Sequence, residues 1–183
     1  MSYSRITTNG GIVELVDFAR ALTRSDVAVP DDGVWSAIRT AMDALGRRDA
    51  PGARMALTTA EDRTDPALSF ATTLLRLRAA CVGGDLADAA VWAEMLRAEP
   101  CFADPVGRAV AAHRLGTYHR LSGDLGSALS RQIEAESLFN DLGWEVEAAL
   151  CSAEVAAIQV TRGDVAGGTY TYWVSDANGC QTS

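Results

Sequence analysis

The residues best suited to acid–base or metal chemistry are two histidines in one predicted helix. His113 and His119 are six residues apart, so their side chains point to different faces and do not form the i, i+4 pair that holds zinc. Neither has a serine or cysteine at a spacing that indicates a nucleophile and its base, although adjacency in the fold stays open. We therefore predict no catalytic residue, no metal site and no cofactor, and we expect that the protein is not an enzyme.

Two further patterns that could carry chemistry are better explained by helix ends and helix surfaces. Gly83-Gly84-Asp85 superficially resembles the signature of diguanylate cyclases, but no strand pattern flanks it and no acidic residue follows it directly. We interpret it as a turn between helices. Glu134 with Glu136, and Asp31 with Asp32, are carboxylate pairs of the kind that general acid–base catalysis uses. At these positions we interpret them as solvated helix faces or caps.

The charge balance argues against nucleic acid and membranes as partners. The 183 residues carry a formal net charge of −8 at pH 7, and all 16 basic residues are arginine. An acidic surface has no general affinity for nucleic acid or for an anionic bilayer. The absence of lysine excludes a Walker-type phosphate lysine, a Schiff-base lysine and the lysine of a kinase.

Targeting and redox signals are also missing from the sequence. Residues 1–11 are polar, and no run approaches the roughly 20 apolar residues that a membrane-spanning helix needs. The four cysteines are widely spaced and form no Cys-x-x-Cys pair, and we interpret Cys81 and Cys151 as small core residues. These observations predict a cytoplasmic protein.

A short phrase, Gly-Asp followed by an apolar residue, recurs along the chain. It is present as Gly84-Asp85, Gly123-Asp124 and Gly163-Asp164, and a degenerate copy, Arg48-Asp49, precedes them. The four aspartates follow one another at intervals of 36, 39 and 40 residues. Periods in this range are typical of stacked helical hairpins, in which each unit buries its apolar face only against its neighbours.

Apolar periodicity and helix punctuation predict about eight helices joined by short connections. The clearest starts are Asp65-Pro66 and Asp104-Pro105, where an N-cap aspartate precedes a proline at the first helical position. The second helix pairs with the third, the fourth with the fifth and the sixth with the seventh, which predicts an all-α solenoid of antiparallel helices. The expected helices span residues 12–22, 34–45, 51–61, 66–82, 85–98, 105–121, 124–141 and 144–162.

The third hairpin carries a family resemblance. Leu115-Gly116, Gly123, Ala128 and Ala135 occupy the relative positions of the small and apolar residues of a tetratricopeptide repeat. The array resembles the looser tetratricopeptide arrays of bacterial signalling proteins, and we assign residues 29–167 to it. The resemblance implies a non-catalytic module that binds a protein or peptide, as the sensory or scaffold region of a bacterial regulator. In such regulators an output domain, for example a diguanylate cyclase, often follows the array.

The same resemblance places the first helix of each hairpin along a concave groove. Aligning Gly116 with Leu77 directs four side chains toward that groove, and two of them are arginines that could hold a carboxylate or a carbonyl by forked hydrogen bonds. The carboxylate clamp of chaperone-binding arrays uses lysine and asparagine instead, so we do not predict recognition of chaperone C-termini. The candidate partner-binding residues are Arg78, His113, Thr117 and Arg120.

The two ends of the chain are predicted to differ from the array. Residues 1–28 contain an amphipathic helix, whereas residues 168–183 alternate like a β-strand and then reach Asn178-Gly179, a strong turn dipeptide. This β-prone tail is similar to the closing strand of β-sandwich repeats in bacterial surface adhesins. Three interpretations stay open: a foreign tail on a truncated array, a native element that covers the eighth helix, or a tethered peptide lying in a groove.

The eighth helix has no predicted hairpin partner. Leu150, Val155 and Ile158 would then form an unpaired apolar face, and the bare end of a solenoid invites association. The alternative function is therefore self-assembly, in which a homodimer formed through this helix brings two output domains together.

Overall fold

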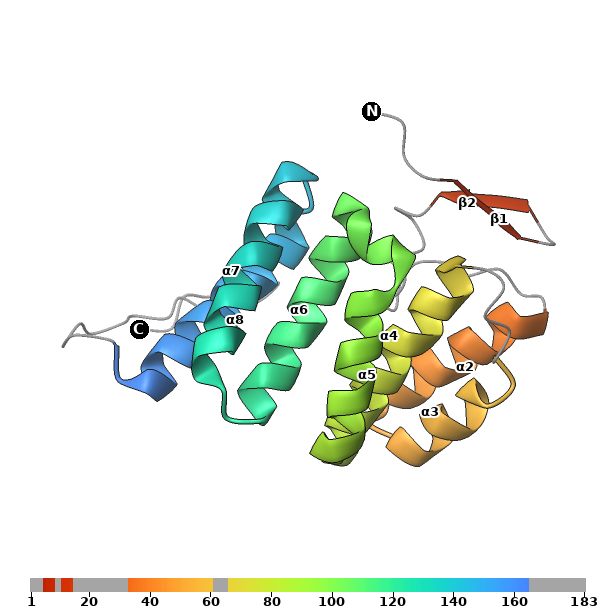
Figure 1. The fold of residues 1–183 in the computed structure, drawn as a ribbon, viewed down its shortest axis with the longest axis horizontal. Helices are drawn as coiled ribbons and strands as arrows, with labels where there is room; N and C mark the ends of the chain where they lie inside the picture. The colour runs from red at the N-terminus through yellow and green to blue at the C-terminus, as the bar shows by residue number, and fades with distance from the viewer. Residues whose placement is uncertain (1–4, 9–10, 15–32, 61–65, 165–183) are drawn as a thin grey trace, which may run out of the picture.

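The computed structural model describes residues 5–8, 11–14, 33–60 and 66–164, and its helices lie side by side in a row (Figure 1). The helices are α2 (Gly33–Gly46), α3 (Ala50–Leu57), α4 (Pro66–Gly83), α5 (Leu86–Ala98), α6 (Pro105–Leu121), α7 (Leu125–Asp141) and α8 (Glu145–Arg162), with a short 3-10 helix, η1 (Pro100–Ala103), before α6. Each helix contacts the next along the chain, and the first helices of successive hairpins, α2 with α4 and α4 with α6, also touch. The predicted all-α array is confirmed for residues 33–60 and 66–164.

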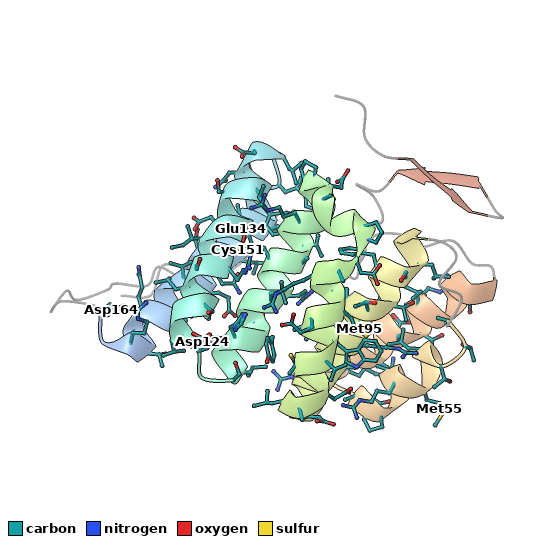
Figure 2. All side chains as sticks on the ribbon, viewed as in Figure 1. Met55, Met95, Asp124, Glu134, Cys151 and Asp164 are labelled. Carbon is teal, nitrogen blue, oxygen red and sulfur yellow. The ribbon has the colours of Figure 1, made fainter. Side chains whose placement is uncertain are left out.

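The recurring Gly-Asp phrase forms the turn inside each hairpin. Gly84 and Gly123 have left-handed backbones, with φ of +73° and +84°, which a residue without Cβ adopts at no steric cost. The aspartate that follows caps the next helix. The carboxylate of Asp124, which Figure 2 labels, accepts a hydrogen bond from the Ser127 N–H at 3.0 Å. Asp85 caps α5 in the same way. The phrase therefore ends one helix and begins the next.

The degenerate copy of the phrase makes the same turn with a strained residue. Arg48 has a φ of 60° and is the one non-glycine residue with positive φ in the described part of the chain. A side chain in this backbone region costs roughly 1–2 kcal/mol. Asp49 still caps α3, because its carboxylate accepts from the Gly52 N–H at 2.8 Å. The repeat thus extends through the first hairpin at the expense of backbone strain.

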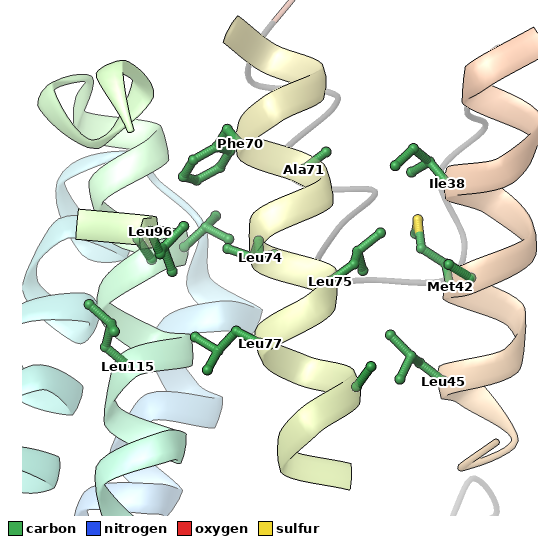
Figure 3. Close-up of a cluster of buried hydrophobic side chains, with 14 of the residues drawn as sticks. Ile38, Met42, Leu45, Phe70, Ala71, Leu74, Leu75, Leu77, Leu96 and Leu115 are labelled. Carbon is green, nitrogen blue, oxygen red and sulfur yellow. The ribbon is translucent and has the colours of Figure 1, made fainter. Parts of the chain in front are cut away.

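Helix α4 is the centre of a core that continues from hairpin to hairpin (Figure 3). One side of α4, with Leu75, faces Ile38 and Leu45 of α2, and the other side, with Leu74 and Leu77, faces α5 and α6. These side chains are almost completely buried, and burying a leucine stabilises a fold by about 1.5–3 kcal/mol. The hairpins therefore stabilise one another instead of each enclosing its own core, as the repeat period predicts.

Small residues let α6 and α7 approach closely. Ala128 and Ala135 of α7 are fully buried, and a Cβ added to Gly116 of α6 would lie 2.8 Å from Gln132 Nε2. Real Cβ atoms essentially never come so close to another heavy atom. These are among the positions on which the tetratricopeptide resemblance depends, and at Gly116 the spacing of the two helices leaves no room for a Cβ.

The N-terminal helix prediction is wrong where it begins. Gly11–Glu14 forms strand β2, which pairs antiparallel with strand β1 (Arg5–Thr8), so the expected helix does not begin at Ile12. In the sequence, Asn9-Gly10 separates the two strands, and this dipeptide is the one that two-residue hairpins favour. The remainder of the predicted helix, residues 15–22, lies outside the described residues.

Other boundaries agree with the sequence to within one or two residues, except at the end of α3. That helix ends at Leu57 and not near residue 61, since the hydroxyls of Thr58 and Thr59 donate back to the carbonyls of Met55 and Ala56. The β-prone tail, residues 168–183, lies outside the part that the structure describes. None of the described helices combines the length and the apolar character needed to cross a membrane.

Candidate functional site

A cavity of about 370 Å³ opens between the turn after α2 and the C-terminal halves of α4 and α6. It therefore draws one element from each of three successive hairpins, on the first helices that the resemblance places along the groove. Apolar side chains, among them Leu77 and Leu121, form part of its wall. The charged part consists of Arg48, Arg78, Arg114 and Arg120.

Helical spacing brings these side chains to one place. On α6, Arg114, Thr117 and Leu121 are three and four residues apart, so they share one face of the helix. On α4, Arg78 and Val82 are four residues apart and share a face in the same way. Contact between α4 and α6 turns the two faces toward a common space.

The cavity concentrates positive charge in an otherwise acidic chain. Burial lowers the pKa of Arg78, and burial together with the neighbouring charge on Arg78 lowers the pKa of Arg114 to about 10. Neither Arg48 nor Arg78 is ion-paired with a carboxylate of the described residues. Burial raises the pKa of the Cys81 thiol, also in the wall, to about 11, so this group brings no compensating negative charge.

Three of the four predicted partner-binding residues, Arg78, Thr117 and Arg120, line this cavity. Arg120 already has a partner, because its Nε lies 3.0 Å from a carboxylate oxygen of Glu154 on α8. The Thr117 hydroxyl donates to the His113 carbonyl at 3.2 Å, which leaves only its lone pairs for a ligand. Arg78 is therefore better placed than Arg120 to hold an anion.

The fourth predicted residue, His113, is not among the cavity-lining side chains and contacts α7 and α8. Its Nδ1 lies 3.0 Å from Gln132 Oε1 and 3.4 Å from the sulfur of Cys151, which Figure 2 labels. Gln132 Nε2 in turn donates to the His113 carbonyl at 3.3 Å. The fold thus brings a thiol next to an imidazole across 38 residues of sequence, a pairing that the spacing alone does not predict.

This cysteine–histidine pair lacks the electrostatics of an activated nucleophile. Burial, followed by the charge on Arg114, lowers the pKa of His113 to about 4. Burial and then the carboxylates of Glu136 and Glu154 raise the pKa of Cys151 to about 12. A thiolate–imidazolium pair needs shifts in the opposite directions. We assign the proton to Nδ1 from its bond to the Gln132 oxygen, so Nδ1 has no lone pair to accept the thiol proton.

A smaller hollow, of about 210 Å³, lies between α3, α4 and α5, and its charged side chains contact one another or Trp92. Arg54 pairs with Asp88 at 3.1 Å, and Asp88 also accepts from the indole N–H of Trp92 at 2.8 Å. The guanidinium of Arg76 lies over the Trp92 ring, 4.7 Å from its centroid, and donates to the Leu57 carbonyl. These contacts hold the three helices together, and we assign the hollow a structural role.

The predicted self-association residues differ in exposure. Leu150 is 54 % exposed, Val155 is half-buried and Ile158 is 0 % exposed, so Ile158 is not available to a partner. Leu150 lies fourteen residues before its repeat aspartate, and the residues at that position in α4 and α6, Ala71 and Val110, are fully buried. Leu150 therefore marks the face that a further hairpin would cover.

Sequence reasoning missed two of the cavity arginines, although a signal for each is present. Arg48 stands where the other copies of the phrase have glycine, which makes it the exceptional member of the repeat. Arg114 precedes Thr117 by three residues and so belongs to the same helix face. The helix rotation that turns this face toward α4 is visible only in the fold.

The described residues include no group of three or more histidine, cysteine, aspartate or glutamate side chains placed to hold a metal ion. Comparisons of the chain with family models, curated proteins and solved structures found no match. The tetratricopeptide resemblance thus stays a prediction from the residues of this chain.

Proposed function

We propose that this protein is a non-catalytic binding module that holds a protein or peptide segment in the groove of its helical array, as the sensory or scaffold region of a bacterial regulator. The observation that carries the proposal is the open cavity between α4 and α6, where Arg78 stands beside apolar side chains and is paired with no described carboxylate. A segment that presents an anionic group next to an apolar one complements both parts of this wall.

The proposed groove continues on α8. Thr117 and Arg120 lie seven and four residues before their repeat aspartate, and the residues at those positions in α8 are Ala157 and Val160. Both α8 residues are exposed, Val160 with its isopropyl group in solvent. The ion pair between Arg120 and Glu154 shows that a side chain of α8 reaches α6 at this level. An apolar strip therefore follows the cationic cavity, which suits an extended segment better than a small isolated ligand.

The proposal is tested by selecting random peptides on the immobilised 183-residue chain and measuring the affinity of the selected peptides by calorimetry. Arg78→Gln should weaken binding by about tenfold, since a hydrogen bond to a charged group contributes about 1.5 kcal/mol. Arg108→Gln is the matched control, because Arg108 is on α6 outside the cavity and pairs with Glu134. The proposal would be refuted if no peptide were selected, or if Arg78→Gln left the affinity of the selected peptides unchanged.

Self-assembly is the second candidate, favoured by the exposure of Leu150 where its repeat counterparts are buried. Light scattering over a range of concentrations separates the two functions. Leu150→Glu should reduce the mass to that of one chain if the uncovered face of α8 forms a dimer. Val160→Glu, by contrast, should weaken peptide binding and leave the mass unchanged. A single-chain mass at every concentration would exclude self-assembly.

A further inference from the structure

We infer that the arginine cavity binds a doubly charged oxyanion, a phosphoryl group, as the anchor of the ligand held in the groove. The inference takes the location of the site from the proposed function and adds the chemistry of the group that fills it. Its basis is the charge, the donor geometry and the backbone of the cavity-lining residues.

The wall carries more positive charge than the described carboxylates balance. Arg48 and Arg78 both lack an ion-pair partner within the described ranges, whereas Arg120 is matched to Glu154. The C-terminal ends of α4 and α6 contribute partial negative charges of about half a unit each, which offsets only part of this excess. A carboxylate brings one negative charge, while a phosphoryl group at neutral pH brings about 1.5 to 2.

The hydrogen-bonding groups of the wall also fit a phosphoryl group. Each guanidinium presents N–H donors in a planar fork that matches two oxygens of a phosphate. Acceptors are scarce by comparison: the Thr117 hydroxyl donates to the His113 carbonyl and offers a ligand only its lone pairs, and the Glu154 carboxylate pairs with Arg120. A ligand group rich in acceptors and poor in donors therefore suits this wall better than an amine, which only donates.

Backbone strain at Arg48 supports the same conclusion independently. The equivalent residues Gly84, Gly123 and Gly163 have φ between +73° and +84° and adopt this turn without strain, while Arg48 holds a φ of 60° with a full side chain. Residues held in such conformations are concentrated at ligand-binding sites. The strained residue is also one that lines the cavity and adds a guanidinium to it.

Calorimetric titration with phenyl phosphate, phenyl sulfate and benzoate at pH 7.5 and constant ionic strength tests the inference. The phenyl ring matches the apolar wall, and the three probes differ in charge and in the number of oxygens. Phenyl phosphate should bind at least tenfold more tightly than phenyl sulfate or benzoate. Arg78→Gln should weaken phenyl phosphate binding about tenfold, Arg48→Gly should weaken it less, and the control Arg108→Gln should have no effect.

Equal affinity for the three probes, or phenyl phosphate binding that is insensitive to Arg78→Gln, would overturn the inference. If Arg78→Gln fails to fold, the discrimination between phenyl phosphate and phenyl sulfate by the unaltered protein decides the question. This comparison needs no variant, because the two probes have nearly the same shape and differ by one charge.

A second pair of probes distinguishes a phosphorylated segment from a small phosphomonoester. Phosphotyrosine is compared with peptides that contain phosphotyrosine between random flanking residues. Tighter binding of the peptides supports a phosphorylated segment, whereas equal affinity keeps the phosphoryl site and overturns the peptide part of the proposed function. Peptides that bind through a carboxylate, with no binding of phenyl phosphate, would overturn this inference and leave the proposed function standing.

Discussion

Replacing Gly116 with alanine tests whether the approach of α6 to α7 depends on a missing Cβ. A Cβ at this position lies 2.8 Å from Gln132 Nε2 and 2.9 Å from the Cδ and Cγ of the same side chain. Gln132 is 0 % exposed. Its amide oxygen lies 3.0 Å from His113 Nδ1, and its amide nitrogen donates to the His113 carbonyl at 3.3 Å. The new methyl group must therefore displace a side chain that has no access to solvent.

Two effects of opposite sign determine the size of the change. Displacing Gln132 loses two hydrogen bonds of about 1 kcal/mol each and adds packing strain of a similar order. Alanine in place of glycine in a helix interior contributes about 1 kcal/mol in the other direction. We expect Gly116→Ala to lower the free energy of unfolding by about 1–2 kcal/mol, which lowers Tm by about 2–8 °C in a chain of this size.

The assay is thermal and urea unfolding of the unaltered protein, Gly116→Ala, Gln132→Ala and the double variant. Without the Gln132 side chain the obstacle is gone, so Gly116→Ala should then stabilise the fold by up to about 1 kcal/mol. Gly126→Ala is the matched control, since its Cβ would meet only Asp124 Oδ1, at 3.7 Å, and it should not destabilise either background. An equal loss of stability from Gly116→Ala in both backgrounds would refute the reasoning.

Three further predictions concern stability. Arg48→Gly should raise the free energy of unfolding by about 1 kcal/mol and Gly123→Ala should lower it by a similar amount, because both positions have positive φ. Urea titration measures both changes, and changes of the same sign would contradict the expectation. Burial holds the pKa of His113 at about 4, so the unfolded chain binds more protons between about pH 4 and 6.5, and stability should fall as pH falls through that range. His113→Gln should reduce the difference in unfolding free energy between pH 7 and pH 4.5 by at most about 3 kcal/mol. Urea unfolding at the two pH values measures this difference, and an unchanged difference would show that His113 is not its source. Ile158→Ala should cost about 2–4 kcal/mol, because its side chain is fully buried, while Leu150→Ala should stay within about 0.5 kcal/mol; similar losses would mean that the two side chains are equally buried.

The helices are predictable from the sequence because their ends are set by local chemistry. The expected span of residues 105–121 agrees with α6, which begins at the proline after Asp104 and ends before Gly123. The caps and left-handed turns act within four residues of each boundary, so no tertiary information is needed to place them. The turn at Arg48 is also set by nearby residues, since the Arg48 N–H donates to the Leu45 carbonyl at 3.1 Å and Asp49 caps the next helix.

The failures occur where two local signals compete or where burial depends on distant neighbours. The apolar spacing from Ile12 onward favours a helix, while Asn9-Gly10 favours a hairpin, and in residues 5–8 and 11–14 the hairpin pairing prevails. On α8, spacing alone does not separate the exposed Leu150 from the buried Ile158. The rotation of α8 against α7 decides which of them is covered, and periodicity leaves that rotation open by tens of degrees.

The cavity shows why a repeat can predict the place of a site better than its chemistry. Four of the lining residues of α4 and α6 occupy matching positions, seven and four residues before the repeat aspartate: Arg78 and Cys81 in α4, Thr117 and Arg120 in α6. The backbone repeats, so these positions of α4 and α6 face one cavity, but the side chains there change from unit to unit, and the residues at the same positions in α2, Met42 and Leu45, are buried in the core. Charge therefore collects at one junction of the array, and only the contact between the two helices shows which arginines stand together.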